Sequence, residues 1–283
     1  MLTFVDYKVE LNLWIALSIL IYAFGVNLTW RWRHAQPARS TPGIEKLRGW
    51  LLASWLLPLL RLAYYVGLPF CLLLNGEAVE RSLRRLLGFS LPLGFLMRGV
   101  LLPRAMGLSG LSIAEWFAGV GIGIALTWGA FLLMAAGWWY CTRSVRELPG
   151  AQTASLTLAN VGEPTAMALP SPTSTWWGLL WETIYAEIHW AFYRAGPIVL
   201  LDNYYAGVFL GFLILSLEWW TNPAWRRGWD PARRRTDVVL HWGLAFVMAI
   251  IFLFTRNLWL AIPLHWVMEM GLARIGAGEN KGG

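Results

Sequence analysis

Charged residues are scarce in this chain of 283 residues. Only 14% of its residues are Asp, Glu, Lys or Arg, and 57% are hydrophobic, whereas a soluble domain has about 25% charged residues. The mean hydropathy is +0.50. This composition excludes an ordinary soluble domain. It predicts an all-α polytopic integral membrane protein, because a helix satisfies its own backbone groups in lipid.

Cysteine is also scarce. The two cysteines, Cys71 and Cys141, fall in or beside apolar runs and form no C-x-x-C pair, so we interpret them as small packing residues. The net charge of +7 lies mostly in loops and belongs to no soluble basic domain. This pattern predicts membrane lipids as partners and argues against nucleic acid.

Tryptophan, in contrast, is abundant, with 20 residues. Many of them lie where apolar runs meet charged loops, as Trp does at the two interfaces of a membrane. The clearest cases are Trp30, Trp32, Trp176, Trp177, Trp219, Trp220, Trp225 and Trp229.

Apolar runs of membrane-spanning length recur along the chain, since a spanning helix needs about 20 apolar residues. A weaker candidate at 82–106 contains four arginines and is interrupted by Pro92 and Pro103. The sequence therefore predicts about seven or eight transmembrane helices. The seven clear candidates are 11–30, 50–75, 115–140, 176–198, 204–220, 237–254 and 257–273.

Two basic loops, 31–48 and 221–236, predict the orientation. Each carries five Lys or Arg residues, and such loops lie on the cytoplasmic side. An even number of spans must then separate them, which holds if 82–106 lies in the interface. The chain would have seven spans in the cell (inner) membrane, with its N-terminus outside and its C-terminus cytoplasmic. With eight spans, one basic loop breaks the rule.

A polar stretch at 142–174 is rich in Ser, Thr, Pro, Ala and Gly, and this composition is typical of a linker. It separates an N-terminal transmembrane region, 1–141, from a C-terminal transmembrane domain, 175–273, which a polar tail follows at 274–283. In the first region, the segment AGVGIG at 118–123 has small residues four apart, which predict a helix-packing face.

Ionisable residues collect in the C-terminal half, although each costs about 2.5 to 3.5 kcal/mol at the centre of a membrane. Three of the four histidines lie in predicted spans there, and the N-terminal half has few comparable groups. We therefore expect the ligand or the chemistry after residue 175. The residues concerned are His189, His241, His265, Glu182, Glu187, Glu218 and Glu269.

Helical spacing groups some of these residues. At about 100° per residue, Glu182, His189 and Tyr193 share one face of a helix, while Glu187 and Arg194 share another. We interpret Glu187 as one half of an ion pair, either with Arg194 or with a cation from another helix.

His265 and Glu269 are four residues apart, hence within direct reach. A carboxylate that holds one imidazole nitrogen leaves the other nitrogen to act as base, donor or metal ligand.

Two stretches resemble the CPBP family, the CAAX proteases and bacteriocin-processing intramembrane proteases. RNLWLAIPLHWVME at 256–269 is similar to the last motif of the family, and HWAFYRAG at 189–196 lies where the family has E-E-x-x-x-R followed by Gly. The resemblance covers about 175–272. It implies a CPBP-like helical bundle and a peptidase in which an activated water cleaves CAAX-type or other peptide substrates.

The chain departs from the motifs of this family. His189 and Trp190 replace the two glutamates, Glu218 stands where the second motif has His, and Glu269 replaces the final Asn, while His265 matches. In the first two motifs, Glu and His have thus exchanged places. Such an exchange would preserve a Glu–His couple, with Glu218 as the base and His189 as its orienting partner. The resemblance thus gives six candidate catalytic residues: Glu187 (an alternative base), His189, Arg194, Glu218, His265 and Glu269.

Two other functions stay open. If catalysis has been lost, the chain would be a non-catalytic subunit of a respiratory or photosynthetic membrane complex that packs against lipid, quinone, haem or pigment. His241 would then be a candidate ligand of haem or chlorophyll. Alternatively, His189, His241 and His265 with Glu218 or Glu269 would bind a divalent metal, since three histidines and a carboxylate suit zinc or iron.

Overall fold

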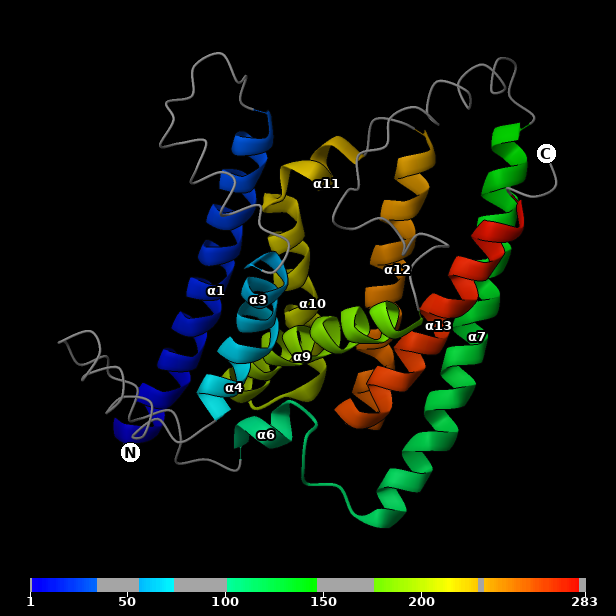
Figure 1. The fold of residues 1–283 in the computed structure, drawn as a ribbon. Helices are drawn as coiled ribbons and strands as arrows, with labels where there is room; N and C mark the ends of the chain where they lie inside the picture. The colour runs from blue at the N-terminus through cyan, green and yellow to red at the C-terminus, as the bar shows by residue number, and fades with distance from the viewer. Residues whose placement is uncertain (1, 35–55, 74–100, 147–175, 229–231, 280–283) are drawn as a thin grey trace. The chain divides into compact units, whose positions relative to one another are not determined.

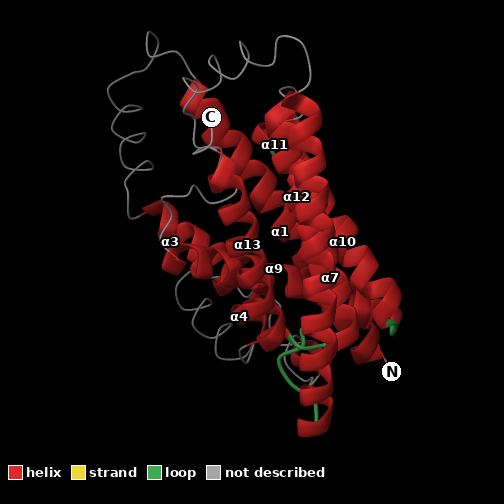
Figure 2. Cartoon of the chain, turned by 90° about the vertical axis from the view of Figure 1, so that its right-hand side faces the viewer, coloured by secondary structure: helices red, strands yellow, loops and turns green. Residues whose placement is uncertain are grey.

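The computed structural model in Figure 1 describes residues 2–34, 56–73, 101–146, 176–228 and 232–279. These residues form helices joined by short turns and include no strand, as Figure 2 shows. The all-α prediction is therefore confirmed for this part of the chain. The predictions for 82–100, for most of the linker at 142–174 and for the end of the polar tail lie outside the described residues.

Three segments of the described helices are long and apolar enough to cross a membrane: Leu11–Arg31, Ile113–Tyr140 and Val238–Thr255. The predicted spans at 176–198, 204–220 and 257–273 are also helices. These helices contain the buried Glu and His residues and are not among the three segments. The total of seven or eight spans and the orientation of the chain stay predictions.

The chain forms two compact units, and each combines segments that are far apart in the sequence. The first consists of Met1–Gly110 and Ile184–Pro223, and the second of Leu111–Thr183 and Ala224–Gly283. Helix α9 passes from the second unit into the first between Thr183 and Ile184. This division differs from the regions predicted on either side of the linker.

The first unit combines helices from the segment Met1–Gly110 with helices from the segment Ile184–Pro223. A π-helical turn, η2, interrupts the short apolar segment between α3 and α4, and its bond from Leu68 N–H to the carbonyl of Ala63 is of the i to i+5 type. Its elements are α1 (Leu2–His34), α3 (Leu56–Leu62), η2 (Ala63–Gly67), α4 (Leu68–Leu73), α6 (Leu101–Ala105), the later part of α9 (Trp176–Leu201), and α10 (Tyr204–Thr221).

A tight turn reverses the chain between α9 and α10. Asp202 has a positive φ of 50°, and the side chain of Asn203 caps α10 by accepting a hydrogen bond of 3.0 Å from Ala206 N–H. The two helices then cross closely at two glycines of α10. Gly207 lies against the backbone of Ile198, and a Cβ on Gly211 would lie 2.7 Å from the Cα of Arg194.

The two helices are antiparallel at this crossing. Gly207 lies against Ile198, whereas Gly211, four residues later on α10, lies against Arg194, four residues earlier on α9. Every residue of α9 from 187 to 199 is buried. A helix that is surrounded in this way can hold polar groups only if they pair with other protein groups.

The second unit packs α7 (Ile113–Arg146) against α12 (Ala232–Thr255) and α13 (Leu258–Glu279). The first part of α9, up to Thr183, also belongs to this unit. So does helix α11 (Pro223–Gly228) from Ala224 onward. Gly119 contacts Thr255, and a Cβ on Gly123 would lie 2.9 Å from Leu264. The packing face predicted at 118–123 is therefore confirmed at these two glycines.

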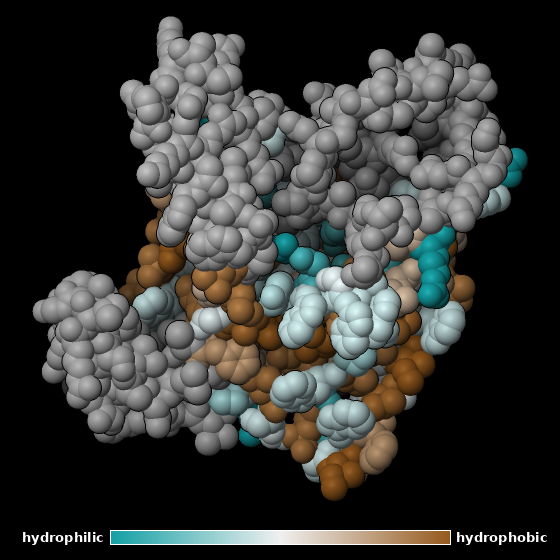
Figure 3. Space-filling view, viewed as in Figure 1, coloured by the Kyte–Doolittle hydropathy of each residue, from teal (hydrophilic) through white to brown (hydrophobic). Residues whose placement is uncertain are grey.

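Many large hydrophobic side chains of the described residues are exposed, and brown areas on the face drawn in Figure 3 show hydrophobic residues at the surface. Large hydrophobic side chains are exposed on α1 and α7, among them Phe24, Phe117 and Leu133. Trp176, Trp177 and several other tryptophans are about half exposed. Such a surface fits the membrane location that the three long apolar helices indicate.

Candidate functional site

A buried histidine–glutamate pair lies in the first unit. His189 on α9 and Glu218 on α10 are joined by a contact of 2.8 Å between Nε2 and Oε2, and each side chain is 1% exposed. The sequence resemblance placed these two residues in one catalytic couple, and the structure brings them together. The close crossing at Gly207 and Gly211 is what allows the two helices to approach.

The imidazole of His189 is enclosed by tyrosine rings. The ring centroids of Tyr193, Tyr65 and Tyr64 lie 4.3, 5.0 and 5.1 Å from that of the imidazole. Its Nδ1 is buried and has no hydrogen-bond partner among the described residues. The histidine therefore has one nitrogen held by a carboxylate and one buried nitrogen without a hydrogen-bond partner among the described residues.

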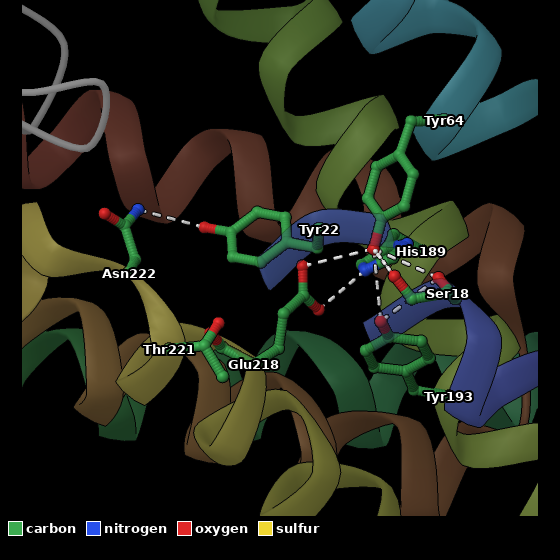
Figure 4. Close-up of polar contacts among 8 residues, drawn as sticks. All are labelled: Ser18, Tyr22, Tyr64, His189, Tyr193, Glu218, Thr221 and Asn222. Atoms are coloured by element: carbon green, nitrogen blue, oxygen red, sulfur yellow. Dashed lines mark hydrogen bonds and ion pairs between the residues drawn. The ribbon is translucent and has the colours of Figure 1, made fainter. Parts of the chain in front are cut away.

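Three hydroxyl groups lie beside the carboxylate, as Figure 4 shows. Ser18 Oγ is 3.0 Å from the Tyr64 hydroxyl and 3.2 Å from the Tyr193 hydroxyl, and the two tyrosine oxygens are 3.2 Å apart. We call these three oxygens the hydroxyl triangle. Tyr64 also lies within donating distance of Glu218 Oε1, at 3.4 Å, and of the Ser18 carbonyl, at 3.1 Å.

The polar cluster continues toward the end of α10. Asn222, which follows the last residue of α10, donates from Nδ2 to the Tyr22 hydroxyl over 3.1 Å, and Figure 4 shows Tyr22 beside Glu218. Both residues are buried. The buried polar groups of the first unit thus come from α1, η2, α9, α10 and the cap of α10.

Two consecutive residues of the π turn, Tyr64 and Tyr65, both contact His189. Such turns are frequent at functional sites. The Tyr65 ring meets the imidazole edge-on at 81°. Its centroid also lies 6.4 Å from that of Tyr185, with the two rings nearly parallel.

Glu187 and Arg194 form the ion pair that the helical spacing predicted. Arg194 Nη2 donates to Glu187 Oε2 over 3.2 Å, and both side chains are buried. Because each charge is paired with the opposite charge, the attraction between them offsets part of the desolvation cost of burying both. Arg194 also lies at the close crossing with Gly211, which places the pair where α9 and α10 are packed most tightly.

The second unit contains the other predicted pair. His265 Nε2 lies 3.4 Å from Glu269 Oε1, and Thr183 on α9 contacts Glu269 Oε2 over 3.0 Å. The ring centroid of His241 is 6.2 Å from that of Trp225.

The predicted candidates thus fall into two groups. Glu187, His189, Arg194 and Glu218 lie in the first unit, and the others in the second. Glu182 is exposed. For the proposed metal site, no group of three or more His, Cys, Asp or Glu side chains within the described helices could hold an ion.

Sequence reasoning missed the contribution of the N-terminal helices. Ser18, Tyr22, Tyr64 and Tyr65 all lie before residue 175, whereas the ligand or the chemistry was expected after it. The pair Gly207 and Gly211, with small residues four apart on α10, was a signal for the helix crossing that brings His189 to Glu218.

Searches against family models, curated proteins and solved structures find no match to this chain.

Proposed function

We propose that this chain is an intramembrane hydrolase of peptide substrates, in which His189 and Glu218 activate a water molecule. The observation that carries the proposal is their buried contact of 2.8 Å, combined with the unpartnered Nδ1 of the same imidazole. A buried ionisable pair is costly in a membrane protein and is by default a candidate functional site.

In this proposal Glu218 is ionised and has no proton to donate, so Nε2 of His189 carries the proton and Nδ1 carries the lone pair. Oε2 accepts from the histidine and Oε1 lies near the Tyr64 hydroxyl. The geometry therefore favours His189 as the base and Glu218 as its orienting partner, the reverse of the roles inferred from the family motifs.

The chemistry balances with these groups alone. Nδ1 of His189 takes a proton from water while the water oxygen forms a bond to the peptide carbonyl carbon. The same proton then passes to the leaving nitrogen as the C–N bond breaks. The products are a carboxyl and an amine, and His189 returns to its starting state.

The substrate class comes from the resemblance to the CPBP family. In this proposal, Glu187 and Arg194 are structural, because each neutralises the other. The water-binding and oxyanion roles that the resemblance implies for His265 stay a prediction from the sequence.

The proposal is tested by identifying the new peptide N-termini that appear in membranes containing the protein. Full-length protein, Glu218→Gln and His189→Gln would be expressed in cells of one strain, and new peptide N-termini would be identified by mass spectrometry. Glu182→Gln is the matched control, since Glu182 is exposed. We expect a set of ends that both site variants abolish and the control retains. The same ends in all four samples, with all four proteins folded, would rule the hydrolase out.

A second candidate is the non-catalytic subunit of a membrane complex. The observation that favours it is the exposed apolar face of α7, which includes Trp128, Leu132 and Leu133. A visible and near-infrared spectrum of the gently purified protein tests it. A haem or chlorophyll band that disappears when His189, His241 or His265 is changed would support this function. Three rings around His189 favour a ligand as small as water there over a porphyrin.

A further inference from the structure

Each carboxylate oxygen of Glu218 has one hydrogen-bond partner within the described residues. Oε2 meets Nε2 of His189 at 2.8 Å, and Oε1 meets the Tyr64 hydroxyl at 3.4 Å. The Glu218 side chain is 1% exposed, and a buried carboxylate oxygen without a donor is costly. Tyr64 is therefore the group that decides how well Oε1 is satisfied.

The hydroxyl proton of Tyr64 has other acceptors nearby, but these have other roles. The Ser18 carbonyl, 3.1 Å away, lies inside α1, where a carbonyl accepts the helical bond from the N–H four residues later. Ser18 Oγ is itself a donor to Tyr64, over 3.0 Å. An ionised carboxylate oxygen is also the stronger acceptor, because hydrogen bonds to charged groups are the stronger ones.

The three protons of the hydroxyl triangle then form one continuous chain, which can be followed in Figure 4. Tyr193 donates to Ser18 Oγ, and Ser18 Oγ donates to Tyr64. Tyr64 in turn donates to Glu218 Oε1. Each hydroxyl has one proton, so this arrangement uses all three, and bonds in such a chain strengthen one another.

We propose that Tyr64 is a positioning residue of the His189–Glu218 couple, because its hydroxyl favours the ionised form of Glu218 and so keeps the imidazole proton on Nε2. This inference rests on the proposed function for its purpose, since Nδ1 acts as a base only while it carries the lone pair. Tyr64 touches neither water nor peptide in this role and acts through Glu218.

The couple has a second form in which the base is lost. When one proton is added to the couple on Nδ1, the proton of Nε2 passes to Glu218 Oε2. The carboxylate becomes a carboxylic acid that donates to Nε2, and the imidazole stays neutral with its tautomer reversed. The hydrogen bond from Tyr64 favours the first form, because it is stronger to a charged oxygen than to a neutral one.

A competing explanation is that the three hydroxyls only hold α1, η2 and α9 together. Loss of the Tyr64 hydroxyl would then lower the stability of the protein and leave the tautomer of His189 unchanged. The tautomer is thus a readout that a merely structural role does not move.

NMR of the histidine rings separates these explanations without any activity assay. Full-length protein with 15N-labelled histidine would be placed in lipid nanodiscs at the lowest pH at which the wild-type protein stays folded. The chain has four histidines, so His189→Gln identifies the signals. We expect Tyr64→Phe to raise the ratio of the second form to the first about tenfold, the difference between a hydrogen bond to a charged group and one to a neutral group.

Ser216→Ala is the matched control. Ser216 is a buried hydroxyl on α10, the helix of Glu218, and donates to the carbonyl of Phe212 over 2.8 Å. Its loss should leave the wild-type ratio. If Tyr64→Phe does not fold, 3-fluorotyrosine in place of Tyr64 keeps the ring and makes the hydroxyl a stronger donor, so the ratio should fall. An unchanged ratio in a folded protein altered at Tyr64 overturns the positioning role.

The two proposals can fail separately. A raised ratio in Tyr64→Phe without any cleaved peptide supports the positioning role and removes the hydrolase. Cleavage that depends on His189 and Glu218, with the wild-type ratio in Tyr64→Phe, supports the hydrolase and removes the positioning role.

Discussion

Both compact units contain a buried histidine–glutamate pair, but the two pairs form in different ways. In the first unit, His189 and Glu218 come from two helices and approach to 2.8 Å, with each side chain 1% exposed. In the second unit, His265 and Glu269 lie four residues apart on α13 at 3.4 Å, and the Glu269 side chain is 12% exposed. The second pair follows from the geometry of one helix, whereas the first exists only when α9 and α10 pack correctly.

The surroundings of the two pairs also differ, because more packed elements contribute side chains around the first pair than around the second. The carboxylate of Glu218 lies beside hydroxyls from α1 and η2, and tyrosine rings enclose His189. The carboxylate of Glu269 has one such hydroxyl contact, from Thr183. Side chains that several packed elements fix in place provide the pre-organisation that chemistry needs. This difference is why we place the proposed chemistry in the first unit.

The largest expected effect comes from separating α9 and α10. Gly211→Leu would place a side chain against the backbone of Arg194, where even a Cβ would lie 2.7 Å from the Cα. We expect the free energy of unfolding to fall by about 4 to 5 kcal/mol, the upper end for single substitutions. Titration with SDS in mixed micelles, followed by tryptophan fluorescence, measures this loss.

Gly25→Leu on α1 is the control, since nothing lies within 4 Å of a Cβ there. We expect a change within about 0.5 kcal/mol, as for substitutions at the surface that meet no packed neighbour. Equal losses for the two variants would contradict the importance of the close crossing.

Features that depend on one helix could be predicted from the sequence. The helices at 176–201 and 258–279 lie where apolar runs placed them. Glu187 with Arg194, and His265 with Glu269, form the contacts that their spacing predicted. In each case both partners lie on the same helix, so its periodicity alone determines that they meet.

The contribution of the N-terminal helices could not be predicted in this way. Ser18 and Tyr64 have neutral hydroxyls, which are less costly in an apolar run than charges, so a search for ionisable groups passes over them. Their meeting with Tyr193 depends on the packing of α1 and η2 around α9. The π turn at 63–67 has no simple sequence signature that we can identify.

The next effect in size is the coupling within the first pair. Glu218→Met alone should lower the free energy of unfolding by about 3 kcal/mol, because it leaves Nε2 of His189 buried without its partner. His189→Leu alone should have a similar effect. In the double variant we expect the losses to fall short of additivity by about 2 kcal/mol, the range of a hydrogen bond to a charged group.

The same SDS titration measures all four proteins of this cycle. Tyr65→Phe combined with Glu218→Met serves as the control cycle, because the ring of Tyr65, which the substitution keeps, packs against the imidazole. Additive losses for His189 and Glu218 would mean that the 2.8 Å contact adds no stability.

The smallest effect is expected in the second unit. The corresponding cycle of His265→Leu and Glu269→Met should show a coupling of about 0.5 kcal/mol, the range of side-chain pairs within one helix or in a membrane protein. The longer distance of 3.4 Å and the partly exposed carboxylate both weaken the interaction. Thr183→Val is a useful addition, because it removes the hydroxyl that contacts Glu269 Oε2 while the side chain keeps its shape. If the coupling in this unit equals that of His189 and Glu218, then packing between helices does not distinguish the two pairs, and the reason for placing the chemistry in the first unit disappears.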